Sequence, residues 1–180
     1  MFSVTKTPSK SPPPQPPPLR EYGHYLVLNH CKTNGPRIIE DTSNLRLSMN
    51  FPVSFNLTLN KAFDQQNIGS CVANAFAAAV QIHTGEIPSR LYLYYNARLG
   101  CRICPSYDSG LELGRALPLM TSYGLPSETL FPYITSQFTS LPPYKSYTDN
   151  SIISQNITYS AIAQKEEILQ HNLYSGNPII

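Results

Sequence analysis

The sequence has no tryptophan, few charged residues and no long apolar run. Charged residues make up 13% of its 180 residues, and the formal net charge is only +2. No cluster of lysine and arginine is dense enough to predict nucleic acid or an anionic membrane as the main partner. The longest apolar stretch, residues 73–80, is interrupted by Asn74 and is too short to span a bilayer.

A secretory signal is also missing from the sequence. Residues 1–6 lead into prolines without the apolar run of about 7–15 residues that such a signal needs. The four cysteines, Cys31, Cys71, Cys101 and Cys104, are therefore expected to be reduced thiols in a cytosol-like compartment. The predicted location is cytoplasmic.

Proline is abundant, and it divides the chain. Seven of the 17 prolines lie within the first 18 residues, and the run 12–18 favours extended polyproline II. We predict residues 1–20 to be a disordered tail, which acts either as a solvated linker or as a ligand for an SH3- or WW-type groove. Residues 21–53 are interpreted as an N-terminal extension with a strand-like run at 25–28, and residues 54–180 as a globular domain.

Helical patterns fill most of that domain. The clearest predicts a helix over 71–83, with Ser70 as its cap and Gly85 as its stop. This segment is rich in alanine and apolar almost all round, so we expect it at the centre of the domain. The remaining helices are predicted over residues 90–98, 110–123 and 163–173, and Pro118 is expected to kink or shorten the second of these.

Strand-like runs come late, at residues 157–159 and 178–180. Helices followed by strands predict an α+β fold with segregated halves. The chain stops at the apolar pair Ile179 and Ile180, which is typical of the opening of a buried strand. Because native termini rarely lie inside a core element, we expect the domain to be incomplete at its C-terminus.

Cys71 is the candidate nucleophile. It opens the predicted central helix directly after the small residues Gly69 and Ser70, where unpaired backbone N–H groups and the helix dipole stabilise the thiolate. Acyl transfer also needs donors for the developing oxyanion; the Cys71 backbone N–H and the side-chain amide of Gln65 are candidates. The alternative is that Cys71 is a buried structural cysteine and Gln65 an ordinary loop residue.

The pattern Asp64-Gln65-x-x-Ile68-Gly69-Ser70-Cys71-x-Ala73-Asn74-Ala75 resembles the nucleophile segment of papain-like cysteine peptidases. It is closest to the non-secreted branch found in bacteria, archaea and large DNA viruses. Flanking segments are also similar to that family, at residues 54–57, 88–96, 108–110, 123–125, 131–133 and 176–180.

The resemblance implies a papain-like fold, in which the helical half with its central nucleophile helix precedes the start of a β-barrel half. It implies hydrolysis of peptide bonds through an acyl-enzyme, with Cys71 as nucleophile and Gln65 as oxyanion donor. Ser109 and Gly110 would offer backbone hydrogen bonds to an extended peptide, and Leu111 would line the specificity pocket. The alternatives are a turn leading into a helix for Ser109 and Gly110, and core packing for Leu111.

Two departures from the family concern the nucleophile segment. Ile68 stands where secreted members have a disulfide-bonded cysteine, which agrees with a reducing compartment. Gln66 replaces the usual glycine after the oxyanion glutamine, so we expect this loop to be tighter or shifted.

The largest departure from the family is the lack of a histidine in the position expected for the catalytic base. Papain-like enzymes need a histidine about 130–150 residues after the cysteine, and an asparagine to orient it. That window opens beyond residue 200, so we expect both residues beyond the end of this chain, and little activity from the chain alone. The four histidines are interpreted as surface or packing residues: His24, His30, His83 and His171. The rival hypothesis is a non-catalytic papain-fold module that binds peptides, or an inactive truncated gene product.

Two other pairs of residues could bind a metal or take part in catalysis. Cys101 and Cys104 have metal-ligand spacing, but no second pair follows, so free loop thiols are expected. Glu166 and Glu167 are interpreted as a solvated helix face. The sequence thus predicts no metal and no cofactor.

Overall fold

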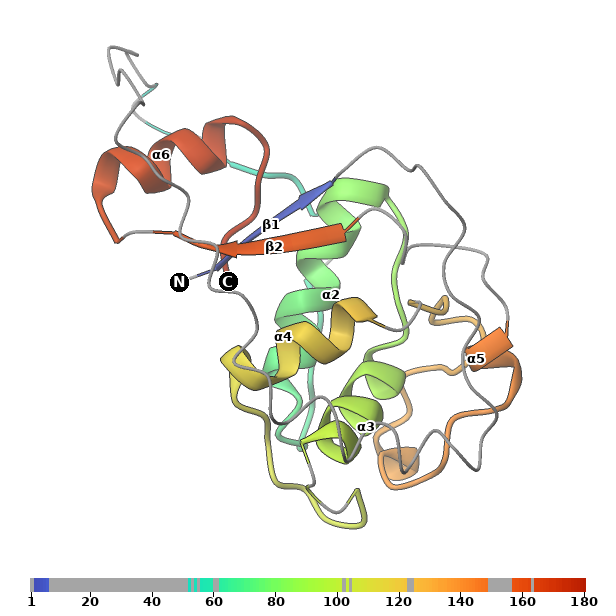
Figure 1. Ribbon diagram of the computed structural model, residues 1–180. Helices are drawn as coiled ribbons and strands as arrows, with labels where there is room; N and C mark the ends of the chain where they lie inside the picture. The colour runs from blue at the N-terminus through green and yellow to red at the C-terminus, as the bar shows by residue number, and fades with distance from the viewer. Residues whose placement is uncertain are drawn as a thin grey trace.

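The computed structural model describes residues 2–6, 52, 54, 56–59, 62–101, 103, 105–122, 125–148, 157–162 and 164–180. Figure 1 shows a helical body that is crossed on one side by a two-stranded sheet. In chain order the elements are β1 (Phe2–Lys6), α2 (Cys71–Thr84), α3 (Arg90–Gly100), α4 (Leu113–Ser122), the 3-10 helix η2 (Thr135–Gln137), α5 (Lys145–Thr148), β2 (Ile157–Ala161) and α6 (Glu166–Tyr174).

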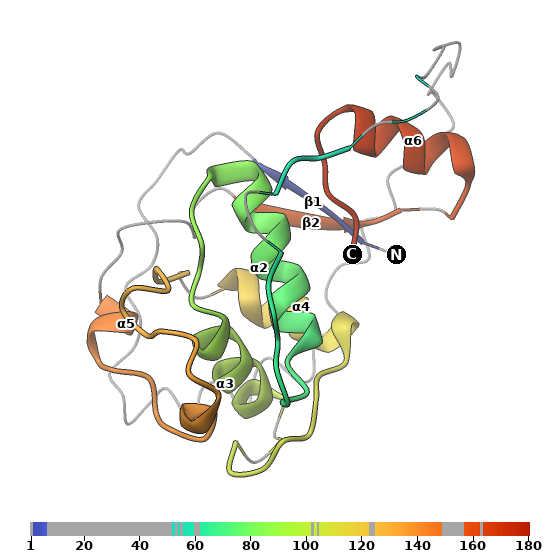
Figure 2. The same ribbon diagram turned by 180° about the vertical axis from the view of Figure 1, so that it is seen from behind.

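Helix α2 runs through the middle of the molecule, as its composition predicts. It packs against α3 and β1, and Figures 1 and 2 show it running from the level of the sheet down to α3. Ala73, Ala77 and Ala79 are buried on it, and such small side chains allow close packing. Gly85 ends the helix in a left-handed conformation with φ 77°, and its N–H donates to the Gln81 carbonyl. Both predicted ends of the helix are therefore confirmed to within one residue.

Helix α3 is almost wholly buried and forms the base of the domain. Ser89 caps it by accepting a hydrogen bond from the Tyr92 N–H, and its hydroxyl donates to the Phe131 carbonyl. Four consecutive residues at its start, Leu91 to Tyr94, are at most 3% exposed. A helix that is buried on every side holds its polar side chains in fixed positions, and two of them reach the candidate site.

Helix α4 begins three residues later than the sequence predicts. Pro118 lies inside it, and the helix nevertheless continues to Ser122. It packs against α3, and its residues Ala116, Leu117 and Met120 are buried in the core. The proline therefore does not end the helix, and packing of α4 in the core offsets the lost backbone hydrogen bond.

The sheet corrects the prediction of a disordered tail. Strand β1 pairs with β2 in antiparallel register, from Phe2 opposite Ala161 to Lys6 opposite Ile157. Ser3 also forms a bridge with Ile179, so β1 lies between β2 and the C-terminal segment. The sequence contains a short strand pattern before the prolines, in which Phe2 and Val4 alternate with polar residues. The disorder prediction is wrong for residues 2–6; the proline run 12–18 and the strand-like run 25–28 lie outside the described residues.

The remaining elements agree with the expected α+β arrangement. Strand β2 confirms the predicted strand at 157–159, and α6 covers most of the predicted helix over 163–173. Helix α6 lies at the opposite end of the molecule from α3 (Figure 1). Among the described helices, none combines the length and apolar character needed to cross a membrane.

We predict that deleting residues 1–6 destabilises the domain. Five cross-strand pairs with β2 would be lost, at a cost of about 1–4 kcal/mol in the free energy of unfolding. Urea denaturation of the truncated and full chains measures this difference. A replacement of residues 2–6 by glycine and serine, which keeps the length, should lose a similar amount. Unchanged stability in both variants would show that these residues form a dispensable tail.

Candidate active site at the start of helix α2

Cys71 is the first residue of α2, and its side chain is exposed. The sulfur is therefore open to solvent at the end of a helix whose interior is buried. No acidic residue lies in the first turn of α2, so no carboxylate there opposes negative charge on the sulfur. The position combines access with a favourable helix dipole, which a buried structural cysteine would lack.

Gln65 is folded into the turn that leads to Cys71. Its side-chain Nε2 donates to the Ile68 carbonyl at 3.1 Å, and the Ser70 N–H donates to the same oxygen at 2.8 Å. The Gln65 carbonyl accepts a hydrogen bond from the Tyr133 hydroxyl at 2.9 Å. Both the backbone and the amide of Gln65 are thus held in the turn before α2, and Nε2 keeps a second N–H.

Gln66 adopts a backbone conformation that favours glycine. Its φ is 55°, in the left-handed region, where the family has glycine at this position. The Asp64 carboxylate accepts from the Gln66 N–H at 2.8 Å, and the Gln66 side-chain oxygen accepts from the Thr135 hydroxyl at 3.0 Å. These two bonds hold Gln66 in a left-handed conformation that glycine would adopt without strain.

A polar cluster that sequence reasoning missed lies beneath the turn. The Tyr133 hydroxyl donates a hydrogen bond to the Gln65 carbonyl. In the hydrogen bond between Tyr133 and Ser70, the serine hydroxyl is therefore the donor. The Asn74 amide donates to the Ser70 carbonyl at 3.0 Å and to the Ser70 hydroxyl at 2.9 Å. Ser70 occupies the N-cap position of α2 but makes no capping bond, because its hydroxyl serves this cluster.

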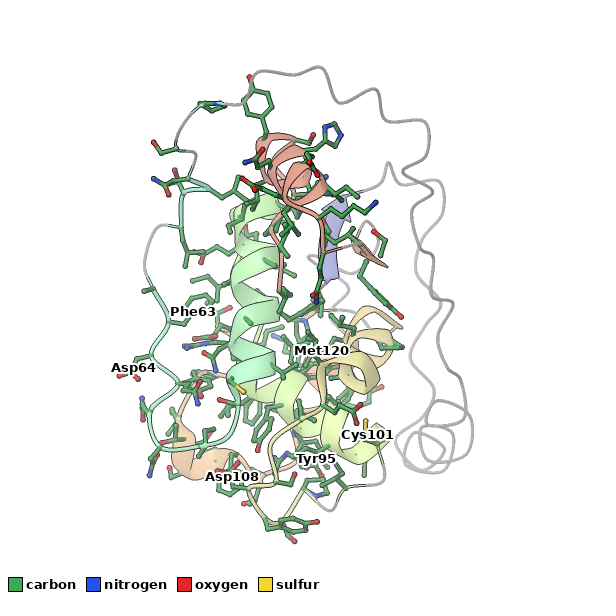
Figure 3. The ribbon with its side chains drawn as sticks, turned by 90° about the vertical axis from the view of Figure 1, so that its left-hand side faces the viewer. Phe63, Asp64, Tyr95, Cys101, Asp108 and Met120 are labelled. Atoms are coloured by element: carbon green, nitrogen blue, oxygen red, sulfur yellow. The ribbon has the colours of Figure 1, made fainter. Side chains whose placement is uncertain are left out.

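Arg90 joins the cluster to the rest of the domain. Its guanidinium forms two hydrogen bonds with the Glu128 carboxylate, at 2.6 and 2.8 Å, and donates to the Asn74 side-chain oxygen at 3.0 Å. It also stacks on the rings of Phe63 and Tyr133, 4.5 and 3.8 Å from their centroids. In Figure 3, Phe63 and Asp64 lie on the segment that runs alongside α2.

Asp108 connects the predicted substrate loop to the nucleophile turn. Its two carboxylate oxygens lie 2.9 and 2.8 Å from the Gly69 nitrogen and accept its N–H. Figure 3 shows Asp108 near the lower end of α2. A side chain at Gly69 would be crowded, because an added Cβ would lie 3.1 Å from the Asp108 carboxylate and 3.2 Å from the Gly110 backbone. The two loops therefore meet through a carboxylate and a pair of glycines.

Tyr94, on α3, meets the same loop from below. Its hydroxyl donates to the Asp108 carboxylate and accepts the Gly110 N–H at 3.1 Å. Burial, and then the hydrogen bond to Asp108, raise the pKa of Tyr94 from 10.0 to about 12. The phenol therefore remains a hydrogen-bond donor at any physiological pH.

The other residues of the predicted substrate loop have distinct environments. Ser109 is exposed, and its hydroxyl donates to the Gly110 carbonyl at 3.1 Å. Gly110 has φ 69°, which only glycine adopts without strain. Leu111 is half-buried and packs against the core, as its alternative interpretation expects. The loop thus lies beside the nucleophile turn, with the Gly110 N–H already engaged by Tyr94.

The described histidines lie elsewhere. His83 is in the last turn of α2, 12 residues from Cys71, which corresponds to about 18 Å along the helix. His171 is in the last turn of α6. Glu166 and Glu167 are exposed at the start of α6, which confirms the predicted solvated face. Cys101 is a half-buried free thiol, and Cys104 lies outside the described residues. Within the described part of the chain, no three metal-binding side chains gather at one point.

The central helix, the exposed cysteine at its start and the small sheet define the class: this is the helical half of a papain-like cysteine peptidase fold. Comparison with known proteins agrees. The chain is 28% identical over 160 residues to an uncharacterised peptidase C1-like protein, L477, of Acanthamoeba polyphaga mimivirus. It matches the crystal structure of xylellain, a cysteine protease from Xylella fastidiosa, with a TM-score of 0.61 and 29% identity over 71% of the chain.

These similarities establish the relationship to papain-like cysteine peptidases, and they cover part of each relative. The chain spans 49% of the mimivirus protein and 55% of xylellain, about half the length of either. No protein-family model matches the sequence.

We predict that Gln66→Gly gives a more stable protein than Gln66→Ala, by about 1 kcal/mol. Both variants lose the hydrogen bond from Thr135, so they differ mainly in the cost of positive φ at this position. Denaturant midpoints at an unchanged m-value measure the difference. An alanine variant as stable as the glycine variant would contradict the left-handed conformation of Gln66.

We predict that Tyr94 contributes to alkaline unfolding. Because its pKa is about 12 in the folded chain and 10.0 ordinarily, the stabilisation from its protonated hydroxyl is complete below pH 10 and is lost as the pH approaches 12. Burial also raises the pKa of Tyr147 and of Tyr159, so they add to the same decline. Between pH 10 and 12, the unfolding free energy of Tyr94→Phe should fall less than that of the unmodified chain.

Tyr144→Phe is the matched control for this titration, because Tyr144 is 64% exposed. Its unfolding free energy should fall with pH as steeply as that of the unmodified chain. Equal slopes for all three proteins would mean that the Tyr94 hydroxyl is not held protonated by its surroundings.

Proposed function

We propose that this chain carries the nucleophile half of a papain-like cysteine peptidase, with Cys71 as the nucleophile and Gln65 as an oxyanion donor. The observation that supports this most is the exposed thiol at the start of the buried helix α2, directly after a turn that contains the Gln65 amide. Names of the related proteins, a peptidase C1-like protein and a cysteine protease, agree with this chemistry. The domain that performs it would span residues 54–180, with β1 packed on it.

The proposed reaction has two stages. The Cys71 thiol gives its proton to an imidazole base, and the sulfur bonds to the carbonyl carbon of the scissile peptide, whose π electrons move to the oxygen. The Cys71 backbone N–H and the second N–H of Gln65 Nε2 donate to this oxyanion. Collapse breaks the C–N bond, and the amine leaves with the imidazolium proton. Water then hydrolyses the thioester, which releases the acid and restores the thiol.

The base is assigned to neither His83 nor His171. At about 18 Å along the helix, the His83 imidazole is far outside the hydrogen-bond reach that proton transfer needs. His24 and His30 lie outside the described residues. Because papain-like enzymes carry the histidine about 130–150 residues after the cysteine, the imidazole and its orienting amide are proposed to lie beyond residue 180 or to come from a partner segment. Peptidase activity of the 180-residue chain alone is then expected to be low.

The proposed substrate is an extended peptide that lies along the loop at residues 109–111. Strand addition needs free backbone donors and acceptors. Because the Gly110 N–H is engaged by Tyr94, the contacts would be made by the backbone of Ser109 and by the second lone pair of the Gly110 carbonyl, which also accepts from the Ser109 hydroxyl. Leu111 would offer an apolar surface to a substrate side chain through the part of it that the core leaves uncovered.

We predict that a peptidyl epoxide labels Cys71 selectively at neutral pH. The exposed Cys71 thiol at the start of α2 should react faster than the half-buried Cys101, and peptide mapping by mass spectrometry identifies the modified residue. A Cys71→Ser variant should lose this labelling. Equal labelling of all cysteines would remove the support for an activated thiol. Saturable peptide binding without labelling would favour a non-catalytic peptide-binding module.

A further inference from the structure

We propose that Asp108 and Tyr94 are positioning residues that clamp the predicted substrate loop against the nucleophile turn. The clamp consists of three groups: the Gly69 N–H, the Asp108 carboxylate and the Tyr94 hydroxyl. Its role in peptide hydrolysis rests on the function proposed above. The clamp itself is a feature of the fold, and its existence can be tested separately.

The carboxylate is the first part of the clamp. Both Asp108 oxygens face a single N–H at 2.8 and 2.9 Å, and a hydrogen bond to an ionised acceptor is about twice as strong as a neutral one. Gly69 lies two residues before Cys71, in the turn that leads into α2. Fixing its peptide group therefore limits how the turn, and with it the thiol, can move.

The Tyr94 hydroxyl is the second part. Tyr94 is 0% exposed. Its hydroxyl donates to the Asp108 carboxylate and accepts from the Gly110 N–H, so it contacts the loop at two positions. Because it belongs to the buried helix α3, it holds the carboxylate from a rigid base. Without that hydroxyl, the exposed Asp108 side chain would rotate more freely away from Gly69.

Arg98 supports the same loop one helical turn further along α3. Its guanidinium stacks on the Tyr94 ring, 3.9 Å from the centroid, and donates to the carbonyls of Pro105 and Tyr107 at 3.0 and 2.7 Å. The residues directly before Asp108 are thus held from α3 as well. The loop approaches the nucleophile turn along a path that two buried side chains determine.

The clamp links the two loops through hydrogen bonds. A carboxylate, a phenol and two glycines in close contact set the spacing between the loop that would bind a peptide and the sulfur that would attack it. Reactions that need both parts in register should depend on the clamp, whereas reactions of the thiol alone should not.

The test compares two alkylating probes on the full 180-residue chain. A peptidyl epoxide needs the loop and the thiol together, while iodoacetamide needs only the thiol. For Tyr94→Phe and Asp108→Asn, we expect epoxide labelling of Cys71 to slow about tenfold, the effect of one lost hydrogen bond to a charged group. Iodoacetamide labelling should remain at the rate of the unmodified chain, and Tyr144→Phe should change neither rate.

The double variant tests whether the two residues act as one unit. If they do, Tyr94→Phe combined with Asp108→Asn should lose no more than the more impaired single variant. Equal slowing with both probes would show a general loosening of the domain, and no slowing with either would show that the clamp does not position the loop. Either result would overturn the proposal.

Hydrogen exchange separates the clamp from the peptidase hypothesis. The Gly69 and Gly110 amides should be protected in the unmodified chain, and the Gly69 amide should exchange faster in Asp108→Asn while the interior of α2 stays protected. An unprotected Gly69 amide in the unmodified chain would disprove the clamp whatever the reactivity of Cys71. If the epoxide fails to label the unmodified chain while these amides are protected, the proposed function fails and the clamp remains as a structural feature.

Discussion

The buried guanidinium of Arg90 is the interaction on which the site depends. Removing such a cation from water costs several kcal/mol, so it is tolerated only where its N–H groups find acceptors. Here they find the Glu128 carboxylate, the Asn74 amide oxygen and, at 3.4 Å, the Asp64 carbonyl. The segment before α2, α2 itself and the loop after α4 each supply one of these acceptors. All three must be in place for the charge to be satisfied, and this requirement fixes their relative positions.

The turn before the nucleophile is fixed in consequence. The Arg90 guanidinium stacks on the Tyr133 ring, and the hydroxyl of that ring holds the Gln65 carbonyl. A chain of contacts therefore leads from a helix in the core to Gln65, in the turn before Cys71. Because α3 is buried, these contacts start from a well-packed element. The position of the turn is set by packing and polar contacts, without a metal or a disulfide among the described residues.

Sequence patterns predicted the local features of this arrangement well. The alanine-rich pattern and Gly85 gave the extent of α2, because helix propensity and a left-handed stop act within one element. The spacing of Gln65 and Cys71 predicted that both lie at the start of that helix. The positive φ of Gln66 was not predicted, because it depends on hydrogen bonds with Asp64 and Thr135 that the sequence does not reveal.

The long-range pairings were not predicted, for a physical reason. Arg90 meets Glu128 across 38 residues, and Gly69 meets Asp108 across 39. Such pairs carry no periodic signal, since they arise only when the core has brought distant loops together. Strand β1 was not predicted, because seven prolines within the first 18 residues favour an extended tail without a strand partner. Its partner β2 lies more than 150 residues away in the sequence, and a short strand without a partner nearby resembles a tail.

The same polar network makes the site sensitive to single changes. When one member of a buried hydrogen-bond network is replaced, its former partners are left with unsatisfied donors or acceptors. The effect of a substitution therefore spreads beyond the residue that is changed. Ser70 illustrates this, because its hydroxyl contacts Tyr133 and Asn74 and is not available to cap α2. The helix nevertheless forms, since burial of Phe76, Ala77 and Val80 stabilises it independently of a cap. Because packing stabilises α2, the side chains of its first turn are available for polar contacts with the loops, and the Cys71 thiol can be exposed at the end of a stable helix.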